Sequence, residues 1–161
     1  MRYAWIKTAV LAAGFAFAMG QPVLAQTSAE NLKTGEAYLA KVAKQPGVVV
    51  LPSGVMYRTV ARSLTPGAQP TVADNVTIEY EGKLISGAVF DSSYARHEPA
   101  NFPLGRLIKA WQVAIPQMHV GDEIILYTPP SQAYGERDLS PDIPPNSTLI
   151  FRVHLVAIGA Q

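Results

Sequence analysis

The sequence contains no cysteine, and this absence excludes several classes of protein at once. Disulfide scaffolds, thiolate nucleophiles and cysteine-based zinc sites all require that residue. The three histidines, His97, His119 and His154, are too few and too widely spaced to predict a zinc site, so no metal or cofactor is expected. Charged residues make up only 16% of the 161 residues, and the net charge of +1 predicts no nucleic acid as a partner.

The sequence also lacks the motifs of common hydrolases and nucleotide-binding enzymes. It has no Gly-x-Ser-x-Gly elbow, no His-Glu-x-x-His motif and no glycine-rich phosphate loop that opens a helix. A pair of carboxylates of the glycosidase kind is not excluded, but no pattern singles one out. We interpret His119 and His154 as structural or solvated side chains.

Long apolar runs are absent except near the start of the chain. Arg2 and Lys7 precede an apolar run at residues 8–19, and small or apolar residues follow up to Ala25. This order predicts a secretory signal peptide at residues 1–25, cleaved after Ala25. The run is shorter than the roughly 18 to 20 residues that cross a bilayer. We therefore expect no membrane span in the mature form and a location in the periplasm.

Without residues 1–25, 136 of the 161 residues remain, with 11 basic and 12 acidic side chains and a net charge of −1. Twelve of the 13 prolines remain, about 9% against a usual ~5%. This proline content disfavours a bundle of long helices. A loop-rich β or α+β domain fits the composition better.

The first stretch after the signal peptide predicts a short helix over residues 26–45. Ser28 or Asn31 is expected to cap it, and Pro46-Gly47 to end it. One stripe of the helix carries apolar residues: Leu32, Tyr38, Leu39 and Val42. A helix this short cannot form its own core, so we expect an arm that packs on the domain or on another copy. Residues 48–51 and 55–60 predict two strands around a turn at 52–54.

The rest of the chain predicts a sheet with one helix. Apolar residues alternate at Val72, Val76, Ile78 and Tyr80, and Ser86-Gly87 then predicts a hairpin turn. Further strands are expected at 124–127 and 149–156. One helical stripe lies between them, made by Trp111, Ala114, Ile115 and Met118. The pattern predicts an α+β fold, an antiparallel sheet with a single short helix on one face.

Aromatic and apolar residues are unusually frequent in the predicted loops and at the ends of elements. They are Tyr80, Phe90, Phe102, Ile108, Trp111, Tyr134, Ile143 and Phe151. Each could belong to a packed core. As a set they could also line an apolar cavity, because two tyrosines, a tryptophan and the neighbouring Asp91 supply polar groups. The residues alone leave both interpretations open.

Seven short segments in a fixed order suggest a family. They are Tyr80-Glu-Gly82, Gly87-Ala-Val-Phe-Asp-Ser-Ser93, Pro103-Leu-Gly105, Leu107-Ile108 before Trp111, Met118-His-Val-Gly121, Ala133-Tyr-Gly135 and Ile143-Pro-Pro-Asn-Ser-Thr-Leu-Ile-Phe151. Residues 70–158 closely resemble the FKBP-type peptidyl-prolyl cis/trans isomerases. The lead-in at 51–57 resembles the bacterial exported branch, which includes macrophage infectivity potentiator-like proteins with long dimerising helices that the 26–45 arm does not match.

The resemblance implies a five- to six-stranded antiparallel sheet wrapped around the short helix of Trp111. It implies three parts: the signal peptide at 1–25, a helical arm with lead-in strands at 26–69, and the isomerase domain at 70–158. Trp111 would form the floor of a pocket, and its substrate-binding walls would be Phe90, Leu107, Ile108, Ile143 and Phe151. Asp91, Tyr134 and Tyr80 match the catalytic positions, and Arg96 matches the basic partner of Asp91.

The chain departs from the family pattern at the rim of the expected pocket. The departures are Ala100, Ala110, Leu139 and Asp142. They bear on substrate preference and on affinity for macrolide inhibitors, while the floor of the pocket keeps the family residues.

The resemblance therefore predicts a peptidyl-prolyl cis/trans isomerase that needs no metal or cofactor. Its partners would be proline-containing unfolded or nascent exported polypeptides, with macrolides as inhibitors. Because the arm at 26–45 is too short for the intertwined dimer of the long-helix relatives, we expect a monomer. The alternative is a non-catalytic periplasmic chaperone or binding module with the same fold. Asp91, Tyr134 and Trp111 are all present, which favours the enzyme.

Overall fold

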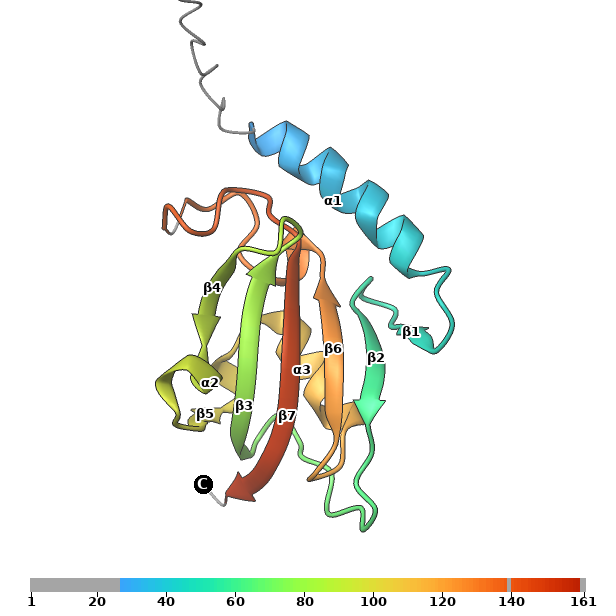
Figure 1. The fold of residues 1–161 in the computed structure, drawn as a ribbon, viewed down its shortest axis with the longest axis vertical. Helices are drawn as coiled ribbons and strands as arrows, with labels where there is room; N and C mark the ends of the chain where they lie inside the picture. Colours follow the sequence, from blue (N-terminus) through green and yellow to red (C-terminus); the bar gives the residue numbers. More distant parts are fainter. Residues whose placement is uncertain (1–26, 139, 160–161) are drawn as a thin grey trace, which may run out of the picture.

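The computed structural model describes residues 27–138 and 140–159, so the predicted signal peptide lies outside the described residues. Figure 1 shows a curved sheet with helices on both of its faces. The elements in chain order are α1 (Ser28–Val42), β1 (Val48–Val50), β2 (Met56–Ala61), β3 (Asn75–Leu84), β4 (Val89–Ser92), α2 (Ser93–Arg96), β5 (Ala100–Pro103), the 3-10 turn η1 (Leu104–Arg106), α3 (Lys109–Ala114), the 3-10 turn η2 (Ile115–Gln117), β6 (Glu123–Thr128), the 3-10 turn η3 (Pro130–Gln132) and β7 (Leu149–Gly159).

The described strands form one antiparallel sheet of seven strands in the order β1-β2-β6-β7-β3-β4, with β5 also paired to β3. The long strands β3 and β7 lie at its centre and pair from Asn75 opposite Gly159 to Leu84 opposite Leu149. The predicted α+β fold, with an antiparallel sheet around one short helix, is confirmed, although the sheet has seven strands where five to six were expected. No pattern predicted β5, which is only 4 residues long.

The main core lies between the sheet and α3. Alternate residues of the strands point to this side, and in β3 these are Val76, Ile78 and Tyr80. All four residues of the predicted helical stripe are buried there. The helix changes form within the stripe, because Pro116 lacks the amide hydrogen that would continue the α-helical ladder. It therefore ends at Ala114 and continues as η2.

Strand β3 starts later than the sequence pattern indicates. Val72 was expected on this strand, but it precedes β3 and 51% of its surface is exposed. The side chain of Asp74 accepts hydrogen bonds from the backbone N–H and the hydroxyl of Thr71. This local turn competes with strand pairing, so β3 begins only at Asn75.

The predicted arm is α1, which packs on the opposite face of the sheet from α3 (Figure 1). Leu39 and Val42 are buried against one row across β2, β6 and β7: Met56, Tyr127 and Ile150. Tyr38 packs at the edge of this cluster, whereas Leu32 is 37% exposed. Of the two placements expected for the arm, on its own domain or on another copy, the structure shows the first.

The cap of α1 differs from the two expected residues. Thr27 caps the helix through a capping box with Glu30: the Thr27 hydroxyl accepts from the Glu30 N–H, and the Glu30 carboxylate accepts from the Thr27 N–H. Ser28 and Asn31 instead hold the loop before β7. The Asn31 side chain donates to the Pro145 carbonyl at 3.0 Å, and the Asn146 side chain donates to the Ser28 hydroxyl at 2.8 Å.

Gly35 lets α1 approach the start of β7 closely. A Cβ at this position would lie 2.2 Å from the side-chain oxygen of Thr148, a distance that no real Cβ contact tolerates. The absence of a side chain therefore sets how near the first half of α1 can lie to the loop at residues 143–148.

Candidate active site

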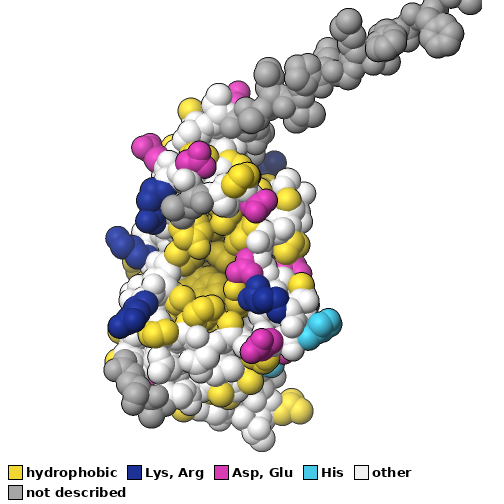
Figure 2. All heavy atoms as spheres, turned by 90° about the vertical axis from the view of Figure 1, so that its left-hand side faces the viewer, with side chains coloured by type: hydrophobic (Ala, Val, Ile, Leu, Met, Phe, Trp, Pro, Cys, Tyr) yellow, Lys and Arg dark blue, Asp and Glu magenta, His cyan; other side chains and the backbone are white. Residues whose placement is uncertain are grey.

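An apolar pocket opens on the side of the sheet that carries α3. Its volume is about 220 Å³. Figure 2 shows it as a hollow of hydrophobic side chains with charged residues around the rim. Seven elements or loops contribute the lining residues, which are Tyr80, Phe90, Asp91, Phe102, Leu107, Ile108, Trp111, Tyr134 and Phe151.

Two aromatic rings contact the indole at the bottom of the pocket edge to face, and a third packs against one of them. Trp111 lies 5.3 Å from Tyr80 and 5.2 Å from Phe151, between ring centroids, at interplanar angles of 77° and 88°. Phe90 packs against Phe151 in the same way at 5.8 Å. Such pairs add about 0.5–1.5 kcal/mol each beyond the burial of their surface, so the walls of the pocket are stiff.

Gly82 makes room for this arrangement. It lies on β3 beside the pocket, and a Cβ there would come within 2.6 Å of Phe90 and 2.8 Å of Phe151. Any side chain at this position would push the two rings apart. The Tyr-x-Gly segment that begins at Tyr80 therefore supplies one wall of the pocket through Tyr80, and Gly82 leaves room for the rings of Phe90 and Phe151.

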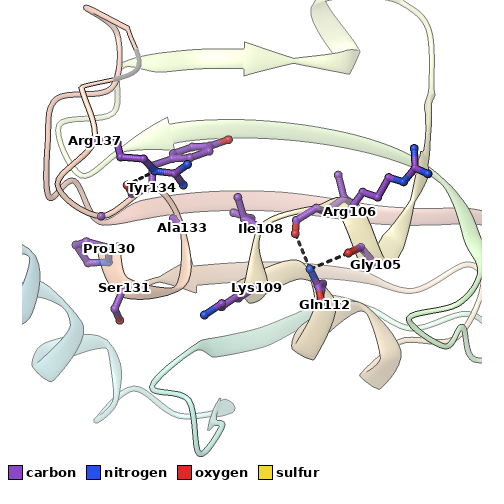
Figure 3. Close-up of a pocket in the computed structure, with 12 residues that line it drawn as sticks. Gly105, Arg106, Ile108, Lys109, Gln112, Pro130, Ser131, Ala133, Tyr134 and Arg137 are labelled. Carbon is purple, nitrogen blue, oxygen red and sulfur yellow. Dashed lines mark hydrogen bonds between the residues drawn. The ribbon is translucent and has the colours of Figure 1, made fainter.

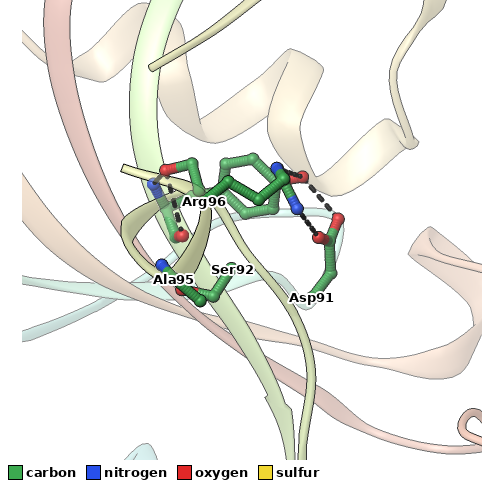
Figure 4. A network of polar contacts seen from close by, with 6 residues as sticks. Asp91, Ser92, Ala95 and Arg96 are labelled. Carbon is green, nitrogen blue, oxygen red and sulfur yellow. Dashed lines mark hydrogen bonds and ion pairs between the residues drawn. The ribbon is translucent and has the colours of Figure 1, made fainter. Parts of the chain in front are cut away.

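A polar network holds one wall in place (Figure 4). The Tyr80 hydroxyl donates to one oxygen of Asp91, and the Arg96 guanidinium forms an ion pair with the other. Arg96 also donates to the Tyr80 hydroxyl at 3.1 Å. Ser92 caps α2 by accepting from the Ala95 N–H at 3.2 Å, which places Arg96 one turn away from Asp91. Both oxygens of Asp91 are therefore engaged within the protein.

The network sets the ionisation of its members. Partial burial raises the pKa of Asp91, but the hydrogen bonds from Tyr80 and Arg96 outweigh it and leave this pKa below its usual value. Burial and the hydrogen bond to Asp91 raise the pKa of Tyr80. At neutral pH the carboxyl group is thus ionised and the phenol is protonated.

The opposite wall carries two donors without partners. Within the described part of the chain, no group bonds the Tyr134 hydroxyl, and no group accepts from the Ile108 N–H. Burial, and then the charge of Asp91, raise the pKa of Tyr134, so its hydroxyl keeps its proton. A bound amide carbonyl could accept from either donor.

The loop that presents Ile108 is held from α3. The Gln112 side chain donates to the carbonyls of Leu107 at 2.7 Å and Gly105 at 3.2 Å (Figure 3). Sequence reasoning did not single out Gln112. Its position one helical turn after Ile108 is the only signal in the sequence, and such spacing is too common to identify a supporting residue.

The structure brings together eight of the nine predicted site residues and Arg96. Ile143 is the exception: it lies outside the lining, where it is partly buried against the core and bridges to Ser140. Phe102 also lines the pocket; the sequence placed it in the aromatic set that could line a cavity, but not among the residues matched to the family site. It enters from β5, the strand that no pattern predicted.

The residues that depart from the family pattern at the rim of the pocket differ in how deeply they are buried. Ala110 is fully buried, Ala100 is partly buried on β5, and Asp142 is exposed. Leu139 lies outside the described residues.

The described residues contain no cluster of metal-ligating side chains and no helix long and apolar enough to cross a membrane.

Comparison with known families identifies the architecture. Residues 67–156 match the family model of the FKBP-type peptidyl-prolyl cis-trans isomerases. The chain belongs to this family. Residues 8–59 match the domain that lies amino-terminal to FKBP-type isomerases, so both parts of this FKBP-family chain have counterparts among known proteins.

Individual relatives agree with this assignment. The chain is 43% identical over 128 residues to peptidyl-prolyl cis-trans isomerase Mip of Coxiella burnetii, covering 80% of this chain and 55% of the relative. It is 38% identical over 138 residues to FkpA of Escherichia coli, covering 86% of this chain and 50% of the relative. The chain thus spans about half the length of these relatives.

Solved structures show the same fold. The crystal structure of FkpA from Escherichia coli matches with a TM-score of 0.77 at 38% identity, covering 83% of this chain and 61% of that chain. The peptidyl-prolyl cis-trans isomerase of Pseudomonas syringae pv. tomato matches with a TM-score of 0.73 at 30% identity. The match covers 85% of this chain and 98% of the Pseudomonas chain.

Proposed function

We propose that this protein catalyses the cis/trans rotation of X–Pro bonds in proline-containing polypeptides. The observation that carries the proposal is the apolar pocket floored by Trp111, with the free donors of Tyr134 and Ile108 on one side. A proline ring is compact and apolar, and the carbonyls around it are acceptors. The pocket offers a matching surface for both.

The chemistry needs no nucleophile. Rotation about an X–Pro bond meets a barrier of about 18–20 kcal/mol, because the planar amide is stabilised by resonance. The twisted amide has lost that resonance, and its carbonyl is less charge-separated. An apolar pocket favours the twisted state over the planar one, which water solvates better. Each ~1.4 kcal/mol of this preference gives a tenfold higher rate.

We assign roles to the pocket residues from their contacts. Trp111, Phe151 and Phe90 hold the proline ring, with Leu107 and Ile108 at the side. Tyr134 donates to a substrate carbonyl, and the Ile108 N–H anchors the substrate chain. Together these contacts bind the substrate in the orientation that rotation requires.

Asp91 acts mainly through Tyr80 in this proposal. Its two oxygens already accept from Tyr80 and Arg96. The carboxylate therefore fixes the phenol ring that packs against Trp111 and makes that wall a rigid surface for the substrate.

The biological setting is also a proposal. The predicted signal peptide favours export to the periplasm, and one relative, 40% identical over 129 residues, is named outer membrane protein MIP of Legionella longbeachae. We place the helical arm and lead-in strands at 26–69 and the isomerase domain at 70–158. The substrates would then be unfolded or newly exported polypeptides.

We also propose that the protein is a monomer, since α1 packs on its own sheet. Light scattering at low micromolar concentration measures this directly. The mass of one chain is expected, and a mass twice as large would contradict the assignment.

A coupled peptide assay tests the enzymatic proposal. The assay follows the cis-to-trans conversion of short peptides with Leu or Phe before Pro. Micromolar protein should raise the rate well above the spontaneous one, and a macrolide that fills the pocket should abolish the gain. The spontaneous rate, combined with measurable peptide binding, would favour the non-catalytic binding module instead.

A further inference from the structure

A second, more polar groove adjoins the apolar pocket. It has a volume of about 560 Å³, within the ~300–1,000 Å³ typical of ligand clefts. It runs between the start of α3 and the turn after η3 (Figure 3). The two cavities share Leu107, Ile108 and Tyr134, so a chain that leaves the pocket on this side enters the groove directly.

Three cations line this groove: Arg106, Lys109 and Arg137. All three side chains are exposed, and no ion pair among the described residues involves any of them. Figure 2 shows basic side chains gathered along one side of the hydrophobic hollow. The only polar contact of these three side chains within the described ranges is from Arg137 Nε to the Tyr134 carbonyl at 3.1 Å.

The two sides of the pocket therefore differ in charge. On the side of the pocket away from the groove, Arg96 is neutralised by its ion pair with Asp91. On the groove side no lining residue is acidic, and Glu136 and Asp138, which flank Arg137 in sequence, lie outside the lining. The net charge of the whole chain is only +1, so this concentration of positive charge is local.

From this arrangement we propose that the groove is a subsite for acidic residues flanking the X–Pro bond. The inference rests on the proposed isomerase function and adds a substrate class to it. An extended chain advances about 3.3 Å per residue, so residues two or three positions from the proline reach the groove. Aspartate or glutamate there meets the three cations, whereas lysine or arginine is repelled.

Matched peptides test the subsite. Two series share a Leu-Pro core and carry Glu, Gln or Lys two positions before or two positions after the proline. In at least one series kcat/KM should fall in the order Glu, Gln, Lys. The Glu and Lys peptides should differ by roughly three- to tenfold at low ionic strength, and by much less in 0.5 M salt, because exposed charges are screened.

Lys109→Glu is the decisive variant. The Lys109 side chain is exposed and makes no hydrogen bond or ion pair within the described residues, so its replacement should not disturb the pocket. The Glu peptide should lose its advantage, and Lys109→Glu combined with Arg106→Glu should favour the Lys peptide. Lys44→Glu is the matched control: it makes the same change in net charge beyond the end of α1, and the preference should remain.

The outcomes separate this inference from the isomerase proposal. If the protein turns over all the peptides but treats Glu and Lys alike, the subsite is wrong and the isomerase proposal stands. A preference that survives Lys109→Glu with Arg106→Glu would also overturn the subsite. If no peptide is turned over, the isomerase proposal fails, and anisotropy of labelled peptides then tests the subsite by binding. Equal binding of the Glu and Lys peptides would reject it.

Discussion

The two faces of the sheet carry clusters with different consequences for the molecule. On one face the core between the strands and α3 is also the floor of the pocket, through Trp111 and Phe151. On the other face a smaller cluster, centred on Leu39 and Val42 of α1, only attaches the arm. A change in the first cluster should therefore affect folding and catalysis together, and a change in the second should affect mainly folding.

The largest expected effect comes from Trp111→Ala on the pocket face. Its indole is 4% exposed and contacts both Tyr80 and Phe151. Removing it should cost about 3–5 kcal/mol in the free energy of unfolding and abolish turnover. Trp111→Leu keeps much of the apolar volume, so it should reduce kcat/KM more than it reduces stability. Urea unfolding and the peptide assay on both variants measure the two effects, and a fully active Trp111→Leu would contradict this account.

Gly35→Ala tests the arm face. The new Cβ would clash with the Thr148 side chain, and we expect a loss of about 1–3 kcal/mol in the free energy of unfolding, despite the better helix propensity of Ala. Turnover of the folded protein should change by less than about twofold, because the overpacked contact lies on the far face from the pocket floor. Urea unfolding and kcat/KM are the measurements.

The double variant Gly35→Ala with Thr148→Ala supplies the control. Thr148→Ala removes the clashing oxygen, which has no hydrogen-bond partner within the described residues. The double variant should therefore recover the stability lost in Gly35→Ala. If it does not, the loss comes from elsewhere in α1, and the close approach is not the cause.

The smallest effect concerns pH. Hydrogen bonds from Tyr80 and Arg96 lower the pKa of Asp91. The contribution of this carboxylate to the free energy of unfolding is therefore fully present above the unfolded pKa of about 3.9, and it is lost as the pH falls through the folded pKa. The raised pKa values of Tyr80 and Tyr134 keep both phenols protonated. A profile of kcat/KM should thus be flat from about pH 6 to 8, and a group titrating near neutrality would argue against these assignments.

The sequence predicted the features that depend on local periodicity or on contiguous segments. The strands other than β5, the helical stripe of Trp111 and most pocket residues follow from alternation, from 3.6-residue spacing or from the family segments. Val72 shows the limit of this reasoning: it continues the alternation, but the local bonds between Asp74 and Thr71 prevent the strand from extending to it.

The features that the sequence did not predict depend on contacts between distant residues. Ser28 and Asn31 have the chemistry of helix caps, but their partners are Asn146 and Pro145, more than 110 residues away. Asn146 has a positive φ of 57° and also donates its backbone N–H to the Gly135 carbonyl. Phe102 reaches the pocket from a strand too short to show a pattern. Such placements follow from the folded chain and leave no periodic signal.

The most direct test of the central claim compares turnover and stability in Tyr134→Phe and Asp91→Ala. Tyr134→Phe removes one donor, which we expect to lower kcat/KM about tenfold while the free energy of unfolding changes by about 1 kcal/mol or less. Asp91→Ala should lower turnover as well, by releasing Tyr80 and Arg96. Wild-type turnover in both variants, or losses that only follow their stability, would contradict the claim that these residues form a working isomerase pocket.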